Sequence, residues 1–141
     1  MAGYSGTPLV KKLGIKEGFS LSMVETPADV LKELGISSGK SNGKPPLDYV
    51  HLFVKTQAEL KNKFPFWAAK LAPAGMLWIS WPKKSSGVES DLNENIIRDI
   101  GLAAGLVDVK VCAVNEIWSG LKFVIRLKDR AASKSKNTKI K

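Results

Sequence analysis

Two short and almost continuously apolar runs limit the fold of this chain more than any other feature. One run is DYVHLFV at residues 48–54, and the other is GMLWISW at residues 75–81. Strands have this composition when both of their faces are covered, as in the parallel sheets of α/β proteins. The runs therefore predict two central strands of a parallel sheet.

Helices are predicted between and after these strands by two capping boxes. Residues 56–59 read TQAE and residues 91–94 read DLNE, and each box introduces apolar residues at helical spacing. Pro65 is expected to kink or divide the first of these helices, because proline has no backbone N–H. This part of the chain thus alternates strand, helix, strand and helix.

The two ends of the chain complete the predicted architecture. A helix over residues 8–13, a strand over residues 19–23 and a helix over residues 27–34 precede the apolar runs. Near the C-terminus, residues 107–113 and 121–127 alternate apolar and more polar side chains, which predicts a β-hairpin. We predict an α/β fold, a three-layer Rossmann-like sandwich with a mainly parallel sheet and a C-terminal antiparallel β-hairpin.

Positive charge is concentrated at the C-terminal end. The chain has 22 Lys and Arg residues against 13 Asp and Glu residues, a net charge of +9. We predict a single α/β domain over residues 1–127 and a disordered basic tail over residues 128–141, because the tail has too few apolar side chains to build a core. The tail is predicted either to bind nucleic acid weakly and without sequence specificity, or to serve solubility alone.

Neither a membrane nor a metal is expected. No apolar stretch reaches the roughly 18 residues of a membrane span and no signal segment is seen, so we predict a soluble, cytoplasmic protein. Cys112 is the single cysteine and His51 the single histidine, which leaves too few ligands for a closed zinc site. We expect Cys112 to serve packing and His51 to be a hydrogen-bonded structural residue.

Three segments are similar to an uncharacterised family of small bacterial proteins: GYSGTPLVKKLGIKEG, GMLWISWPKKSSGV and GLVDVKVCAVNEIWSGLKFV. The order of predicted elements over residues 48–127 also resembles the later part of the class I methyltransferase fold. This resemblance implies a truncated Rossmann-like domain. A shared fold does not by itself transfer an activity.

The cofactor-binding parts of the methyltransferase fold do not match this sequence. There the first strand leads into a glycine-rich turn, whereas residues 24–29 read VETPAD, without a glycine. The second strand, whose acidic end would bind a ribose, is replaced by a polar loop at residues 35–46. Within this loop, GISSGKS has three residues between its glycines where a phosphate-binding loop needs four, so it predicts a solvated loop. No cofactor is therefore assigned.

The best candidate for a ligand site is the segment that follows the second apolar run, because open α/β sheets bind ligands at the carboxyl ends of their strands. The candidate ligand-binding residues are Lys55, Trp81, Lys83, Lys84, Ser85 and Trp118. Ammonium groups can neutralise an anion, and indole rings offer a stacking surface. The alternative is that both tryptophans cover the margin of the core while the lysines face water. Tyr4 and Ser5 are weaker candidates.

These observations favour a noncatalytic or regulatory binding module that takes an anionic small molecule or a protein partner at this edge. The sequence shows no carboxylate pair and no nucleophile with a base, so no catalytic residue is assigned. The alternative is a divergent S-adenosylmethionine-dependent methyltransferase-like enzyme that holds its cofactor through unusual backbone contacts. The oligomeric state stays open.

Overall fold

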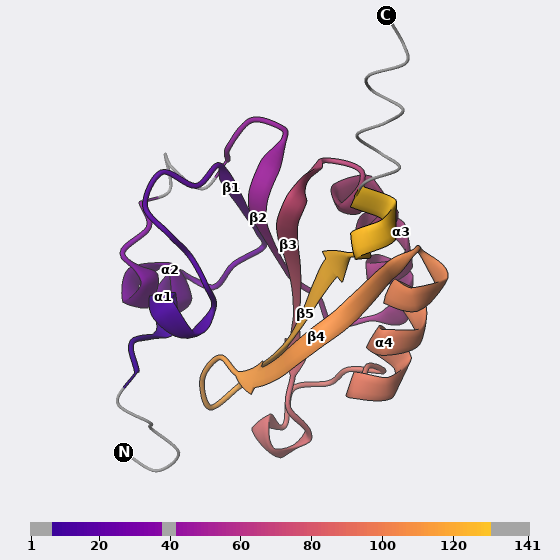
Figure 1. Cartoon of the computed structure of the whole chain (residues 1–141). Helices are drawn as coiled ribbons and strands as arrows, with labels where there is room; N and C mark the ends of the chain where they lie inside the picture. Colours follow the sequence, from indigo (N-terminus) through magenta and orange to yellow (C-terminus); the bar gives the residue numbers. More distant parts are fainter. Residues whose placement is uncertain (1–6, 38–41, 131–141) are drawn as a thin grey trace, which may run out of the picture.

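The computed structural model describes residues 7–37 and 42–130, which build one five-stranded sheet with helices on both faces (Figure 1). The strands are β1 (Leu21–Val24), β2 (Leu47–Phe53), β3 (Leu71–Pro82), β4 (Leu106–Ala113) and β5 (Trp118–Ile125). The helices are α1 (Leu9–Lys12), α2 (Ala28–Leu34), α3 (Gln57–Ala68) and α4 (Glu94–Ala103), with a short 3-10 helix, η2 (Lys84–Ser86), after β3.

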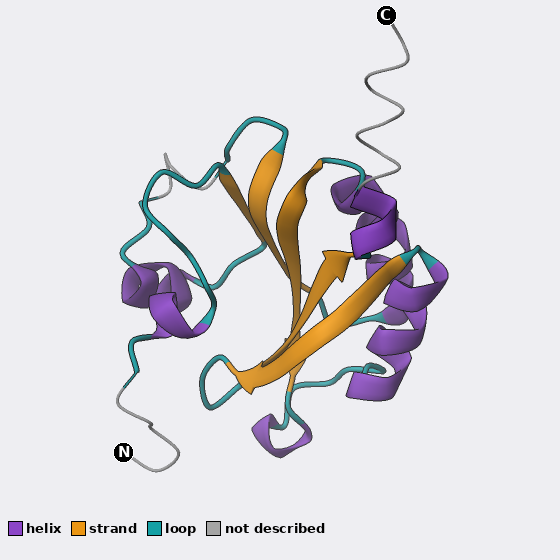
Figure 2. Cartoon of the chain, in the orientation of Figure 1, coloured by secondary structure: helices purple, strands orange, loops and turns teal. Residues whose placement is uncertain are grey.

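The strands lie in the order β1-β2-β3-β5-β4. The strands β1, β2 and β3 run parallel, β5 is antiparallel to β3, and β4 is antiparallel to β5. Figure 2 shows the sheet between α1 and α2 on one side and α3 and α4 on the other. The predicted three-layer α/β fold, with its antiparallel C-terminal pair, is confirmed.

Strand β2 has the apolar sequence of a strand with both faces covered. Tyr49 and Phe53 pack with α1 and α2, whereas Val50 and Leu52 pack with α3 and α4. All four side chains are buried. The continuous apolar run was therefore a correct indication of a central strand.

The N-terminal layer is fixed to the sheet by a buried indole. Trp78 on β3 is fully buried, and its Nε1–H donates a hydrogen bond of 3.0 Å to the carbonyl oxygen of Leu13, directly after α1. Leu13 is also fully buried. This contact places the C-terminal end of the four-residue helix α1 over β3, although so short a helix has little stability of its own.

Two helices begin at side-chain caps. At α3, Thr56 Oγ1 accepts a hydrogen bond from the Glu59 amide, as the capping box predicts. At α4 the cap is Asn93, whose side chain accepts from the Ile96 amide, and not the predicted Asp91. Asp91 Oδ1 instead accepts from the Gln57 amide at 2.8 Å, which joins the starts of α3 and α4.

Two expectations about element boundaries need correction. Pro65 does not divide α3, which continues through it to Ala68. Strand β3 begins at Leu71 and not at Gly75, because the chain already pairs there with Leu47 before the register shifts. Gly75 lies in this irregular stretch, where an added Cβ would come within 2.5 Å of the Leu47 carbonyl oxygen.

The sheet ends at β1, where residues 42–43 take the place of a further strand. Asn42 forms an isolated antiparallel bridge with Ser22, and the Gly43 amide donates to the Leu21 carbonyl oxygen at 2.6 Å. A Cβ on Gly43 would lie 2.7 Å from the Leu21 backbone, so this close approach needs glycine. The chain thereby covers part of an edge that would otherwise expose backbone groups.

None of the helices in the described part of the chain is long and apolar enough to span a membrane. A turn of helix covers residues 127–130, so the first residues of the predicted tail continue the fold. Residues 131–141, and with them the rest of the predicted tail, lie outside the described residues.

Candidate functional site

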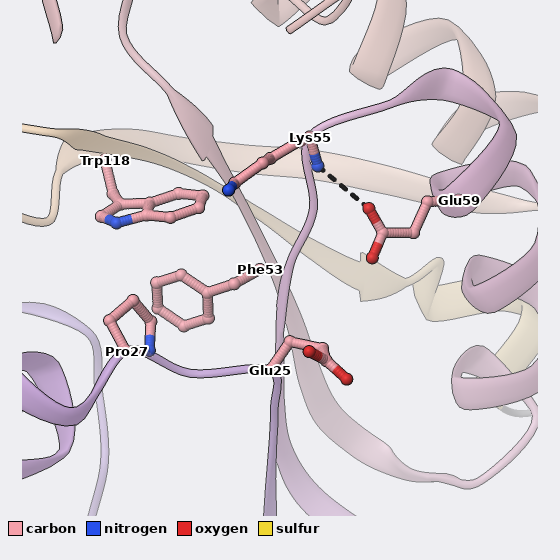
Figure 3. A pocket seen from close by; sticks show the side chains of 6 residues that line it. All are labelled: Glu25, Pro27, Phe53, Lys55, Glu59 and Trp118. Atoms are coloured by element: carbon pink, nitrogen blue, oxygen red, sulfur yellow. Dashed lines mark hydrogen bonds between the residues drawn. The ribbon is translucent and has the colours of Figure 1, made fainter. Parts of the chain in front are cut away.

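A pocket of about 330 Å³ opens at the carboxyl ends of β1 and β2 (Figure 3). The residues that line it are Glu25, Pro27, Phe53, Lys55, Glu59 and Trp118. The turn after β1, the end of β2, the start of α3 and the start of β5 each contribute to its wall. Open α/β sheets bind their ligands at this edge, and the volume lies at the lower end of the roughly 300–1,000 Å³ of small-molecule pockets.

One end of the pocket is a rigid apolar wall. The rings of Phe53 and Trp118 meet edge to face with centroids 5.2 Å apart. Phe53 also stacks on the ring of His51, with centroids 4.4 Å apart and planes 19° apart. In Figure 3 Pro27 lies beside the Phe53 ring and extends this wall. Only 3% of Phe53 and 8% of Trp118 is exposed, so neighbouring side chains hold both rings in place and a small part of each reaches the pocket.

The opposite end of the pocket carries charge. The Lys55 amide donates to Glu59 Oε1 at 3.1 Å, and Lys63 Nζ donates to Glu59 Oε2 at 3.0 Å. Burial acts to raise the pKa of the Glu59 carboxyl, but the hydrogen bonds from Lys55, Lys63 and Thr56 outweigh it and leave the pKa below its ordinary value. Glu59 therefore stays ionised at neutral pH. The Lys55 ammonium group points toward the Trp118 ring and away from Glu59 (Figure 3).

The turn after β1 has two unusual features beside the pocket. Glu25 has a φ of 58°, in the left-handed region that few residues other than glycine adopt. The hydroxyl oxygen of the next residue, Thr26, is buried and has no hydrogen-bond partner among the described residues. Each feature costs free energy of the order of 1–3 kcal/mol, and such costs are found most often at functional sites.

A buried chain of hydrogen bonds lies beneath the Phe53 ring. Tyr49 Oη and His51 Nδ1 are 2.8 Å apart, and His51 Nε2 and Ser80 Oγ are 2.7 Å apart. Burial lowers the pKa of His51 to about 3 and raises the pKa of Tyr49 well above its usual value, with a smaller contribution from Cys112 in the case of Tyr49. Both groups are neutral, and neither His51 nor Ser80 is exposed to a ligand. His51 thus has the hydrogen bonds expected of a structural residue.

The structure brings together two of the predicted site residues, Lys55 and Trp118. Trp81 lies on the other face of the sheet, in the core beneath α3 and α4, with only 7% of its surface exposed. Lys83 joins β3 to η2, and its amide donates to the Ile117 carbonyl oxygen at 2.7 Å. None of the pocket-lining residues comes from this segment, so Lys84 and Ser85 in η2 also lie apart from the pocket. Tyr4 and Ser5 lie outside the described residues.

Sequence reasoning missed four pocket residues: Glu25, Pro27, Phe53 and Glu59. A usable signal existed for the first, because an acidic residue that directly follows a parallel strand reaches the ligand-binding edge. Phe53 lies in an apolar run that predicted only a core residue, and Glu59 lies in a capping box that predicted only a helix start. That both residues also line the pocket depends on the strand order, which brings the start of β5 near the end of β2.

No protein-family model matches this chain, and no curated protein sequence matches it significantly. Solved structures do match. An S-adenosylmethionine-dependent methyltransferase from Aquifex aeolicus has a TM-score of 0.58 at 16% identity, over 84% of this chain and 88% of that one. The fold is that of class I methyltransferases. At this identity the likeness shows the fold alone.

Two further structures support the assignment of this methyltransferase fold. Ribosomal protein L11 methylase from Lactobacillus delbrueckii subsp. bulgaricus has a TM-score of 0.54 at 12% identity, over 84% of this chain and 75% of that one. LepI in complex with S-adenosylmethionine has a TM-score of 0.51 at 10% identity, over 85% of this chain and 47% of that one. The chain spans 60% of the magnesium protoporphyrin IX methyltransferase from Synechocystis that it also matches.

These neighbours correct the main functional prediction. A noncatalytic or regulatory binding module is contradicted, because the solved structures that share the fold include an S-adenosylmethionine-dependent methyltransferase and a ribosomal protein methylase, which favour the alternative. The missing glycine in residues 24–29 had weighed against that alternative. In the structure, Glu25 supplies the left-handed backbone conformation at this turn without a glycine.

Proposed function

We propose that this chain is a divergent S-adenosylmethionine-dependent methyltransferase-like enzyme, whose cofactor binds in the pocket at the ends of β1 and β2. The observation that carries the proposal is the position of the pocket next to the turn after β1, in a fold shared with S-adenosylmethionine-dependent enzymes. The strained Glu25 backbone and the unpartnered Thr26 hydroxyl at this turn add support.

The chemistry of the pocket fits most of this cofactor. S-adenosylmethionine combines a flat base with a carboxylate, an ammonium group and a sulfonium centre. The wall of Phe53 and Trp118 suits the base, the Lys55 ammonium suits the carboxylate, and the Glu25 carboxylate suits the cationic groups. The unpartnered Thr26 hydroxyl can donate or accept a hydrogen bond.

Among the described residues, none takes the place of the acidic residue that binds the ribose of the cofactor in this fold. The acidic end of a second strand would supply it, and residues 42–43 occupy that side of β1. We therefore assign the main share of binding to Lys55, Glu25 and the aromatic wall. When bound, the cofactor supplies an electrophilic methyl group, and the protein residues orient it and exclude water.

The proposal is tested by binding of S-adenosylmethionine and S-adenosylhomocysteine to the full chain, measured by titration calorimetry. We expect Lys55→Met to weaken binding of either compound roughly tenfold, because it removes a charge-assisted hydrogen bond to the ligand carboxylate. The matched control is Lys84→Met, which makes the same change of charge outside the pocket. Absence of binding to the wild-type chain, or equal losses in the two variants, would contradict the proposal.

We also propose that the protein acts in the cytoplasm. Cys112 is a free thiol with its side chain half-buried on β4. Burial raises the pKa of this thiol, although Lys12 and Lys110 act in the opposite direction. A protein that keeps a single protonated thiol suits a reducing compartment.

A further inference from the structure

Two lysines on neighbouring strands lie on the side of the sheet that faces α1, and the charges of Lys12 and Lys110 both act on the Cys112 thiol there. Lys110 on β4 and Lys122 on β5 are directly opposite each other in the antiparallel register. Lys110 Nζ donates a hydrogen bond of 3.0 Å to the carbonyl oxygen of Lys12, at the end of α1. We call Lys12, Lys110 and Lys122 the lysine cluster.

A bulge in β4 creates this arrangement. The register shifts between Asp108, which is opposite Phe123, and Lys110, which is opposite Lys122. Residues two apart on a regular strand share a face, but here Asp108 faces α4 and binds Arg98 while Lys110 faces α1. The bulge therefore removes the carboxylate of Asp108 from the face that carries the cluster. Bulges often re-aim side chains at functional sites.

The lysine cluster holds like charges together without an ion pair to any described carboxylate. Like charges directly opposite each other on paired strands are destabilising. Within the described residues, the ion pairs join Glu59 to Lys63 and Arg98 to both Glu94 and Asp108, so none involves the cluster.

Lys122 is the member of the cluster whose burial has no structural reason in the described residues. It is half-buried and pairs across the strands with the buried Trp78. Burial lowers its pKa, and the charge of Lys110 lowers it further. Lys110 has a structural partner in the Lys12 carbonyl oxygen, but no described group accepts a hydrogen bond from the Lys122 ammonium.

We propose that the lysine cluster binds the phosphate backbone of a nucleic acid. Compact ammonium groups gathered at one place neutralise phosphate oxygens and release counterions, which is the main source of sequence-independent nucleic-acid binding. Lys110 is exposed on the edge strand, so a long polyanion can reach the cluster without entering a pocket. This surface lies on the folded domain and acts apart from residues 131–141.

The test is the salt dependence of binding to a short fluorescein-labelled oligothymidylate, measured by anisotropy with the full chain. We expect Lys110→Gln/Lys122→Gln to reduce the slope of log K against log salt by about 1.4, since each phosphate contact on a single strand contributes about 0.7. The matched control is Lys32→Gln/Lys61→Gln, which removes two exposed lysines from α2 and α3. Residues 131–141 are unchanged in both variants.

A second measurement separates a binding role from a structural one. Because Lys122 opposes Lys110, Lys122→Gln is expected to raise the melting temperature while it weakens oligothymidylate binding. Equal salt slopes in the cluster variant and the control would overturn the proposal, as would a lowered melting temperature of Lys122→Gln with unchanged binding. Competition by pyrophosphate at the same concentration of phosphate groups as the oligonucleotide would also overturn it, in favour of a small-anion site.

Discussion

Replacement of Gly101 by alanine is expected to destabilise the protein by about 2 kcal/mol, although alanine is the better helix former. Gly101 is buried in α4 against the ring of Phe123 on β5. A Cβ at this position would lie 2.1 Å from Phe123 Cε2 and 2.5 Å from Cζ. Phe123 is itself fully buried and meets the Phe64 ring edge to face at 5.1 Å, so it has no room to turn away. Urea denaturation of Gly101→Ala and the wild type measures the effect.

A double variant tests whether the Phe123 ring is the cause. Phe123→Leu alone should destabilise by leaving a cavity, but Gly101→Ala/Phe123→Leu should lose less stability than the sum of the two changes. The difference between Asp99→Ala and Asp99→Gly, at an exposed position inside the same helix, calibrates the helix propensity alone, at about 1 kcal/mol. A Gly101→Ala protein as stable as the wild type would show that α4 and β5 do not pack this closely.

The arrangement of helices and sheet in layers could be predicted from the sequence, because it depends on local patterns of apolar and capping residues. The run at residues 48–54 and the capping box of Thr56 and Glu59 each report on contacts within a few residues, and the structure confirms both. The predicted N-terminal cap of α4 was wrong, because a long-range hydrogen bond competed with the local capping rule. Asp91 has the sequence position of a cap, but it binds the Gln57 amide, and Asn93 caps α4 instead.

The candidate site was less predictable because it depends on which strands are neighbours and on which face a side chain lies. Trp81 and Trp118 are both aromatic and near strand ends, yet alternation along β3 puts Ser80 and Pro82 on the Trp118 side and turns Trp81 to the other. A shift of one residue along the strand therefore decides whether a side chain lies in the core under α3 and α4 or on the face that carries the pocket. The left-handed backbone conformation of Glu25 could not be predicted from composition or periodicity, because the turn has no glycine to indicate it.

The free energy of unfolding is expected to fall steeply as the pH is lowered from 6.5 toward 3, because burial lowers the pKa of His51 from 6.5 to about 3. The ring is neutral in the folded protein and takes up a proton when the chain unfolds. Its contribution is therefore complete above pH 6.5 and is lost as the pH falls through this window. The loss from this one group amounts to at most about 1.4 kcal/mol per pH unit. Urea denaturation at a series of pH values measures it.

The matched variant for this measurement removes the whole buried chain of hydrogen bonds. Tyr49→Phe/His51→Leu/Ser80→Ala leaves no polar group without a partner, so it is expected to fold and to show a slope flatter by about 1 kcal/mol per pH unit. The single variant His51→Gln serves as a second check, because glutamine cannot take up a proton in this range. The comparison is made above about pH 5, where few carboxylates have begun to titrate. Equal slopes in the wild type and both variants would mean that His51 binds its proton equally well in the folded and unfolded chains, and would contradict the lowering of its pKa by burial.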